Sequence, residues 1–153
     1  MRLYLVRHGD ALSDAQDPER PLSPRGREDA RRIAEALGRA GVRVCEIRHS
    51  GKARAAQTAT ILAKHVGLAD AVPVQNLAPN APVEPLVEEI AARTADLMVV
   101  GHLPFLAVLA SRLLAGDAVV ARVEFEPGAA CCLERDARGV WSLAWLFPPS
   151  LVP

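Results

Sequence analysis

The chain has 153 residues, half of them hydrophobic and 24% charged, which is the composition of a globular protein rather than of a disordered or fibrous one. Lys plus Arg and Asp plus Glu both number 18, so no net positive charge favours the binding of nucleic acid. The length is that of one ordinary domain, and we expect a single domain over residues 1–153.

The cysteines and the longest apolar stretch exclude further classes. Three cysteines without CxxC or Cys/His spacing argue against a disulfide framework and a structural zinc site. The apolar stretch at 103–121 is interrupted by Arg112 and Asp117, which argues against a membrane span. We therefore expect a cytoplasmic protein that has no cofactor or metal and that contacts neither membrane nor nucleic acid.

Strands and helices alternate in the first half of the chain. A polar loop over 10–20 precedes a helix that has Ser23 as its N-cap and Pro24 at its first position. Glycines end this helix and the next one. The expected elements are strands over 2–7, 42–47 and 72–74, and helices that end at Gly41 and Gly67.

The second half continues the alternation and then changes to strands. Its expected elements are a helix carrying Leu86 to Ala91, an apolar strand over 96–102, a helix from Pro104 to about 114, and strands near 122–134 and 140–147. Trp141, Trp145 and Phe147 predict one buried face of the last strand. The order predicts a three-layer α/β/α sandwich with a mainly parallel central sheet and a C-terminal antiparallel strand pair.

Polar side chains follow two of the predicted strands. Arg7 and His8 end the first strand, His102 ends the strand over 96–102, and Arg54 lies in the first turn of a helix. Ligands bind beyond the carboxyl ends of such strands, so we expect these side chains to converge. Alone, each would be an ordinary structural histidine or solvated arginine. Together they predict a pocket for a dianionic phosphoryl group, in which a neutral imidazole attacks phosphorus.

Four segments resemble the ordered motifs of the histidine phosphatase superfamily: "LVRHGDA" at 5–11, "RPLSPRG" at 20–26, "SGKARAAQTA" at 50–59 and "VVGHLP" at 99–104. The resemblance implies a phosphoglycerate-mutase-like fold. It implies that His8 is the phospho-accepting nucleophile, that Arg7, Arg54 and His102 complete the phosphate pocket, and that Gly9 and Ser50 support it. Gly51 stands where the family commonly has proline, a departure that concerns the rigidity of this turn more than the chemistry.

One further departure concerns the substrate. Ester-cleaving members of the family usually carry a glutamate two residues after a leucine, where this chain has Pro79 after Leu77 and Ala78. A general acid accelerates departure of a basic alkoxide by about 10² to 10⁴-fold. An imidazole, with a pKa of about 6.5, departs more easily without one. The chain thus looks most like SixA-type phosphohistidine phosphatases. This predicts a metal-independent phosphatase acting on phosphohistidine in a phosphorelay or phosphotransfer protein.

Two alternatives stay open from the sequence. A small-molecule phosphomonoesterase could use Asp10 or Glu84 as its acid, although a loop-capping role for Asp10 is the plainer interpretation. A non-catalytic phosphate-binding or phosphoprotein-binding module is the second alternative, because fold alone does not define function. His49 is interpreted as a surface packing residue and His65 as a favourable cation in a last helical turn.

Overall fold

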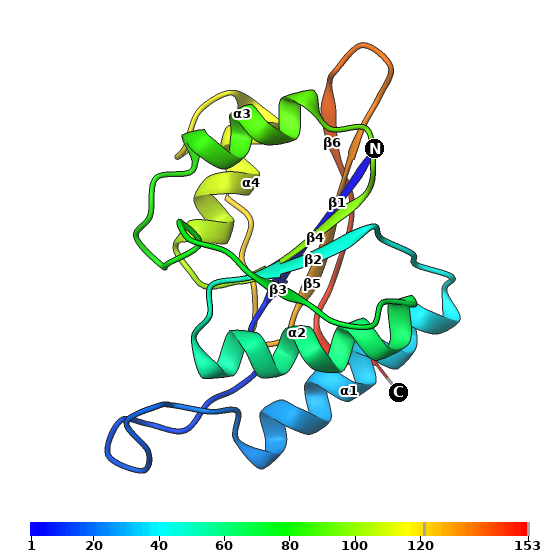
Figure 1. Cartoon of the computed structure of the whole chain (residues 1–153). Helices are drawn as coiled ribbons and strands as arrows, with labels where there is room; N and C mark the ends of the chain where they lie inside the picture. Colours follow the sequence, from blue (N-terminus) through cyan, green and yellow to red (C-terminus); the bar gives the residue numbers. More distant parts are fainter. Residues whose placement is uncertain (121, 153) are drawn as a thin grey trace.

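The computed structural model describes residues 1–120 and 122–152, and position 153 of the expected domain lies outside them. Figure 1 shows the arrangement of the described elements. They are β1 (Arg2–Arg7), α1 (Pro24–Arg39), β2 (Glu46–His49), α2 (Ala53–Val66), β3 (Val72–Pro73), α3 (Glu84–Ala92), β4 (Leu97–Gly101), α4 (Phe105–Ala115), β5 (Ala130–Arg135), β6 (Trp141–Phe147) and the short 3-10 turn η1 (Pro149–Leu151).

All of these strands join one sheet in the order β3-β2-β4-β1-β5-β6. The four strands from β3 to β1 are parallel, whereas β5 pairs antiparallel with β1 and β6 antiparallel with β5. β1 and β4 lie side by side at the centre, so that Arg7 is in register with Gly101. The predicted mainly parallel sheet with a C-terminal antiparallel pair is confirmed.

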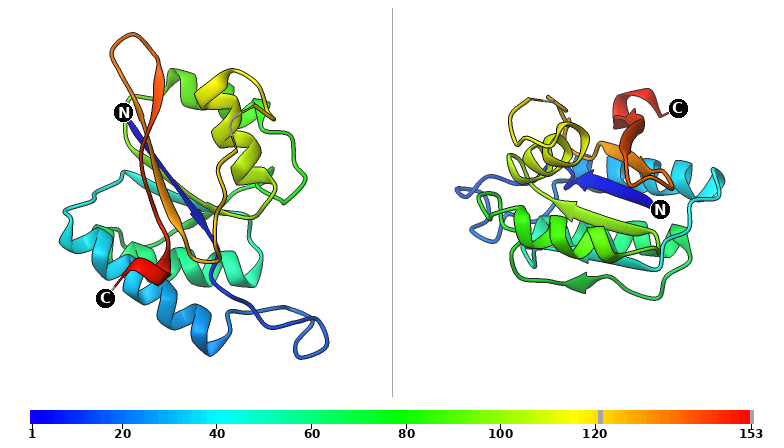
Figure 2. Two further views of the ribbon diagram at one scale, coloured as in Figure 1. Left: turned by 180° about the vertical axis from the view of Figure 1, so that it is seen from behind. Right: turned by 90° about the horizontal axis from the view of Figure 1, so that it is seen from above.

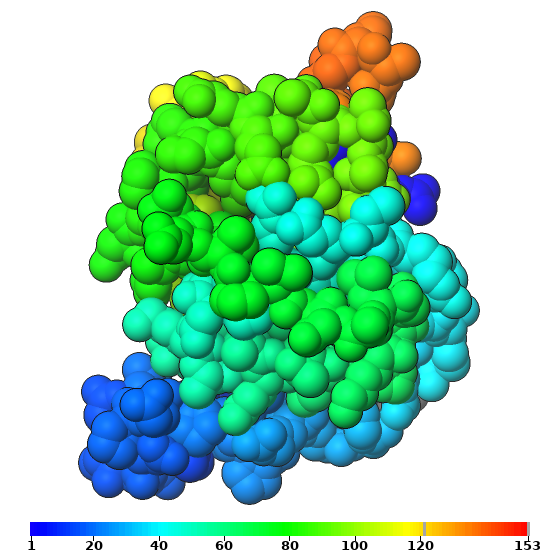
Figure 3. Space-filling view, viewed as in Figure 1, coloured from blue at the N-terminus to red at the C-terminus, as the bar shows by residue number. Residues whose placement is uncertain are grey.

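Helices cover both faces of the sheet, as the views in Figure 2 make clear. One core lies between the sheet and helices α1 and α2, and the other between the sheet and α3 and α4. β4 is buried over its whole length because it is covered on both faces and paired on both edges. The long loop between β1 and α1 projects from one corner of the molecule (Figure 3).

Local sequence explains where the first two helices begin and end. The Ser23 side chain accepts a hydrogen bond from the Gly26 amide, and Pro24 occupies the first turn, where no amide hydrogen is needed. α1 is followed by Gly41 and α2 by Gly67, both with positive φ angles, as predicted. These residues fix the orientation of the two segments that lead to the carboxyl ends of β1 and β2.

Two predicted strands begin later than expected. The Val42 amide closes the end of α1 by donating to Leu37, so the chain reaches β2 only at Glu46. Residues 122–129 are not a strand, because a turn at Pro127–Gly128, with Gly128 at φ +81°, directs the chain into β5. Apolar residues of both segments are buried although the backbone there is irregular. Apolar patterning alone does not distinguish such a segment from a strand.

The predicted single buried face of β6 is wrong. Cys132 pairs with Trp145 but Leu133 pairs with Leu143, so Ala144 is an extra residue in a β-bulge. The bulge shifts the alternation by one residue. Trp145 therefore packs against the core under α1 and α2, while Trp141 packs against the core on the opposite face of the sheet.

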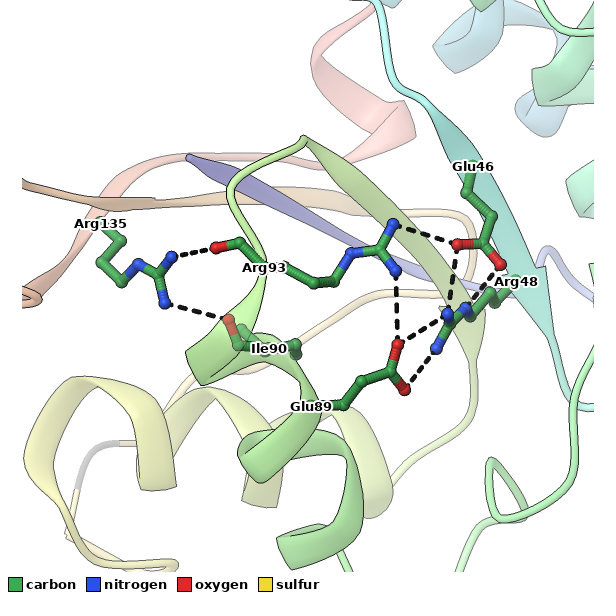
Figure 4. A network of polar contacts seen from close by, with 6 residues as sticks. All are labelled: Glu46, Arg48, Glu89, Ile90, Arg93 and Arg135. Carbon is green, nitrogen blue, oxygen red and sulfur yellow. Dashed lines mark hydrogen bonds and ion pairs between the residues drawn. The ribbon is translucent and has the colours of Figure 1, made fainter.

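A charged network lies near the amino ends of the parallel strands and is shown in Figure 4. Arg48 forms ion pairs with Glu46 and with Glu89 of α3, and Arg93 pairs with the same two carboxylates. Arg135 donates to backbone carbonyls at the end of α3. The network fixes α3 to the amino-terminal end of β2.

Within the described residues, no helix has the length and apolar character needed to cross a membrane.

Candidate active site

The end of β1 is held by backbone hydrogen bonds on two sides. The His8 amide donates to the Gly101 carbonyl of β4 at 3.0 Å, and the His8 carbonyl accepts from the Gly128 amide at 3.0 Å. The Arg7 amide donates to Ala129. The backbone of His8 therefore lies in a fixed position between two neighbouring segments, which is the precision that a reacting side chain requires.

The His8 ring has a defined tautomer. Its Nδ1 lies 2.7 Å from the Gly9 carbonyl, which can only accept, so Nδ1 carries the proton. Nε2 accepts from Arg54 Nε at 3.3 Å and keeps its lone pair. Burial lowers the pKa of His8 to about 4, and the nearby charges of Arg54 and Arg7 act in the same direction, while the Gly9 bond opposes them. At neutral pH the ring is thus an uncharged imidazole.

His102 lies beside His8 at the end of β4. The two ring centroids are 4.9 Å apart. His102 is buried, with 2% of its surface exposed. Its Nε2 lies 2.6 Å from Ser50 Oγ, whereas its Nδ1 is buried and has no hydrogen-bond partner among the described residues. Burial, followed by the charges of His8 and Arg54, lowers the pKa of His102 to about 3.

Two arginines complete the cluster. Arg7 donates from one terminal nitrogen to the Phe125 carbonyl at 2.7 Å, and its Nε is buried without a partner in the described part of the chain. Within that part, no ion pair joins Arg7 or Arg54 to a carboxylate. Burial lowers the pKa of both guanidiniums, which still remain charged. The site therefore keeps positive charge that an incoming anion can neutralise.

Thr58 and Gly26 are structural parts of the site whose roles the sequence did not reveal. Buried Thr58 accepts a hydrogen bond from the Gly9 amide at 3.1 Å and donates one to the Arg54 carbonyl at 2.8 Å. These two bonds join the segment after His8 to α2. A Cβ atom on Gly26 would lie 2.0 Å from the Asp10 carbonyl oxygen, so only glycine fits there. Both residues belong to the recognised motifs, and that was the available signal.

Arg20 is a third cation that the sequence did not single out, although it opens the "RPLSPRG" segment. Its charge contributes to the lowered pKa of both His8 and Arg54. The residue has a positive φ of 49°, donates to the Leu12 carbonyl and pairs with Asp14 at 3.5 Å. Arg20 therefore adds positive potential from the long loop to the cluster at the end of β1.

The candidate acids are not part of this cluster. Exposed Asp10 accepts a 2.6 Å hydrogen bond from Ser23 Oγ, which makes it part of the cap of α1. Glu84 is exposed in the first turn of α3, and no hydrogen bond or ion pair of the described residues connects it to His8 or His102. Pro79 lies in a turn between β3 and α3. The plainer interpretation of Asp10 agrees with its contacts.

The other two histidines differ from each other. His65 lies in the last turn of α2, as expected. His49 is only 7% exposed, so its interpretation as a surface residue is wrong. The end of β2 lies inside the fold because β2 is flanked by β3 and β4. The His49 ring accepts a hydrogen bond from the Gly51 amide at 3.1 Å.

Taken together, the cluster presents a neutral imidazole lone pair surrounded by guanidinium groups that lack carboxylate partners. Guanidiniums bind phosphoryl oxygens in a bidentate manner, and a histidine nitrogen can accept a phosphoryl group.

Comparison with known proteins agrees with this geometry. The sequence model of the histidine phosphatase superfamily, branch 1, matches residues 3–78. A protein from Picosynechococcus without an assigned function is 34% identical over 125 residues, which cover 76% of this chain and 75% of that protein.

The chain belongs to the histidine phosphatase superfamily. Its structure superimposes on the protein histidine phosphatase SixA complexed with tungstate, with a TM-score of 0.89, 26% identity and full coverage of both chains. A structure from Agrobacterium tumefaciens assigned as the phosphohistidine phosphatase SixA gives a TM-score of 0.79, with 28% identity over 97% of each chain. The predicted family and its SixA-like character are thereby confirmed, and the membership supports a phosphatase activity.

A different relative comes from mitochondria. The serine/threonine-protein phosphatase PGAM5 of Mus musculus is 33% identical over 84 residues, which cover 54% of this chain. The matched region spans only 29% of the length of PGAM5. The family therefore includes phosphatases named for different phosphorylated groups, so membership does not identify the substrate.

Proposed function

We propose that this protein is a phosphohistidine phosphatase that removes phosphate from a histidine of a phosphorelay or phosphotransfer protein. The reaction passes through a covalent phosphoryl group on His8. The observation that carries this proposal is the combination of a positioned His8 with no candidate general acid bonded into the cluster among the described residues. Pro79 stands at the position of the family's acid, and Asp10 is engaged by Ser23.

In the first step, His8 Nε2 attacks phosphorus while the bond from phosphorus to the substrate nitrogen breaks. The electron pair of that bond stays on the substrate nitrogen. When the other nitrogen of the substrate ring carries a proton, the ring leaves as neutral imidazole and needs no proton from the enzyme. Arg7 and Arg54 neutralise the phosphoryl oxygens, and Nδ1–H of His8 stays bonded to the Gly9 carbonyl as positive charge develops on the ring.

Arg54 has to change partner during this step. In the present structure its Nε donates to the same His8 Nε2 lone pair that attacks phosphorus. A dianionic phosphoryl group is a better acceptor than a neutral imidazole, so substrate binding transfers this donor to a phosphoryl oxygen. The lone pair becomes free when the substrate is in place.

In the second step, water attacks phosphorus and the bond from phosphorus to His8 Nε2 breaks. One water proton remains on the released phosphate and the other goes to solvent, while Nε2 regains its lone pair. The low pKa of His8, about 4, favours this step because a weakly basic imidazole is a good leaving group. Metal independence remains part of the proposal, since every step uses groups of this chain, water and the substrate.

A substrate panel tests the proposal. We expect kcat/KM for a phosphohistidine-bearing phosphotransfer protein to exceed that for an alkyl phosphate and a phosphoserine peptide, whose leaving groups are basic alkoxides, by at least about 10²-fold, the lower range of general-acid catalysis. The activity should persist in a metal chelator. His8→Ala serves as the control for contaminating phosphatases. Faster turnover of an ester by a comparable factor would overturn the substrate assignment and leave the phosphatase assignment intact.

One alternative has an observation in its favour. The 33% identity to PGAM5 makes a phosphoserine or phosphothreonine protein the competing substrate, and an ester of this kind requires an acid such as Asp10 or Glu84. The small-molecule phosphomonoesterase makes the same demand. A non-catalytic phosphate-binding module would bind phosphate without turning over any substrate in the panel, and it gives no chemical reason for the His8 tautomer.

A further inference from the structure

Two groups of the candidate site lie in the turn between β2 and α2 and in the first turn of α2. Ser50 contacts His102 Nε2 with its hydroxyl at 2.6 Å. Arg54 lies in the first turn of α2, which begins at Ala53, and reaches His8. The position of residues 50–53 therefore sets the orientation of one site histidine and the reach of one site arginine.

Nothing in the backbone conformation alone makes this turn rigid. Gly51 has φ of +83°, and a Cβ atom built on it would meet no atom within 4 Å, so the space on that side of the residue is open. The N-cap of α2, Lys52, makes no side-chain capping hydrogen bond. A proline at position 51, which many family members have, could not adopt this φ. It also lacks the amide hydrogen that Gly51 donates.

His49 holds the turn from beneath. Its Nδ1 accepts the Gly51 amide hydrogen at 3.1 Å. Accepting at Nδ1 requires the tautomer with its proton on Nε2. The ring is 7% exposed, and the His49 carbonyl accepts from the Val74 amide at 2.9 Å. His49 is thus buried and bonded to two segments, through its ring to the Gly51 amide and through its carbonyl to Val74, and it fixes the glycine that lies between Ser50 and Lys52.

We propose that His49 is a positioning residue of the catalytic site: its Nδ1–Gly51 hydrogen bond holds the turn that aligns Ser50 against His102 and presents Arg54 to the substrate. The chemistry of His49 itself is not used, because its ring bonds the backbone and not the phosphoryl group. The proposal adds to the proposed function and uses its assay.

Two substitutions separate positioning from mere packing. His49→Phe keeps an aromatic ring in the buried space and removes the acceptor, whereas His49→Asn loses ring volume and keeps an oxygen near the place of Nδ1. We expect His49→Phe to lower kcat by about 10-fold with KM changed less than threefold, and His49→Asn to recover most of kcat. If Phe keeps full kcat, or if folded Asn is as slow as Phe, the proposal is overturned. His65→Asn, on the far end of α2, is the matched control and should match wild type.

A double-mutant cycle tests whether His49 acts through Ser50. If it does, His49→Phe combined with Ser50→Ala lowers kcat by less than the product of the two single effects. Fully multiplicative losses would mean that the two residues act independently, which contradicts the proposal. The cycle can use whichever phosphorylated substrate the protein turns over, so it remains informative if phosphohistidine is the wrong substrate.

One measurement on the unmodified protein is independent of activity and of mutant folding. An NMR scalar coupling between the Gly51 amide nitrogen and His49 Nδ1 reports the hydrogen bond directly. We expect this coupling, together with an Nδ1 shift typical of an unprotonated ring nitrogen. An Nδ1 that carries the proton would contradict the hydrogen bond and with it the proposal, even if the phosphatase assignment is correct.

Discussion

Two clusters of arginines differ in the partners that surround them. Near the amino ends of the parallel strands, Arg48 and Arg93 share Glu46 and Glu89, and hydrogen bonds to these carboxylates raise the pKa of Arg48. At the carboxyl ends, Arg7 and Arg54 have no carboxylate partner among the described residues, and burial lowers their pKa. The first cluster is neutralised and stabilises the fold. The second keeps its charge, at a cost in stability, for an anion.

The largest expected effect distinguishes these clusters by activity. Arg54→Ala removes a charge that the transition state requires, and we expect kcat/KM to fall by about 10² to 10³-fold, as for loss of one oxyanion donor. The free energy of unfolding should change by less than about 1 kcal/mol, because no carboxylate loses its partner. The measurement is steady-state kinetics together with urea unfolding. A loss of less than about tenfold would show that Arg54 does not act on the phosphoryl group.

The next effect concerns pH and stability. The pKa of His8 is about 4 and that of His102 about 3 in the folded protein, against about 6.5 in the unfolded chain. Below pH 6.5 the unfolded chain binds protons that the folded chain excludes, so the free energy of unfolding falls as pH decreases from about 6.5 to about 4. Urea unfolding of wild type and of His8→Asn/His102→Asn should show a shallower decrease in the double variant. Identical slopes would contradict the buried neutral histidines.

Arg48→Ala is the structural counterpart of Arg54→Ala. It leaves two carboxylates partly unpaired beside α3, and we expect a loss of about 1 to 3 kcal/mol in the free energy of unfolding. Under conditions in which the variant is fully folded, kcat should stay within about twofold of wild type. Urea unfolding and steady-state kinetics measure both quantities. A large loss of kcat in the folded variant would show that the two clusters are not separate in function.

The smallest effect is expected at Asp10. In Asp10→Asn the side-chain oxygen still accepts from Ser23, so phosphohistidine turnover should remain within about threefold of wild type. Any slow ester hydrolysis should keep the wild-type pH profile. If the substitution removes a basic-side limb from the ester profile and lowers its rate by about 10²-fold, Asp10 is a general acid and the ester alternative gains support.

The fold was predictable because its signals are local. Alternating apolar runs and helical spacing predicted the succession of strands and helices along the chain, and Ser23, Gly41 and Gly67 predicted helix ends that the structure has. The bulge at Ala144 was not predictable, since an extra residue in one strand depends on its pairing with the neighbouring strand. The coil over 122–129 was missed because its apolar residues fill the core without strand pairing.

The candidate site was predictable in its members and less so in its supports. Arg7, His8, Arg54 and His102 were predicted, and the structure brings them together; their catalytic roles stay predictions. The partners that hold them are set by tertiary distances. Neither Thr58 bonding the Gly9 amide nor His49 bonding the Gly51 amide leaves a mark in spacing or composition.

Rapid quenching of a single turnover tests the central claim most directly. Enzyme in excess over radiolabelled phosphohistidine protein is mixed with it and quenched in alkali within milliseconds, and the label on the enzyme is located by peptide mapping. The account predicts an alkali-stable, acid-labile phosphoryl group on His8 that is absent in His8→Ala. Substrate turnover without label on His8, or with label on another residue, would contradict it.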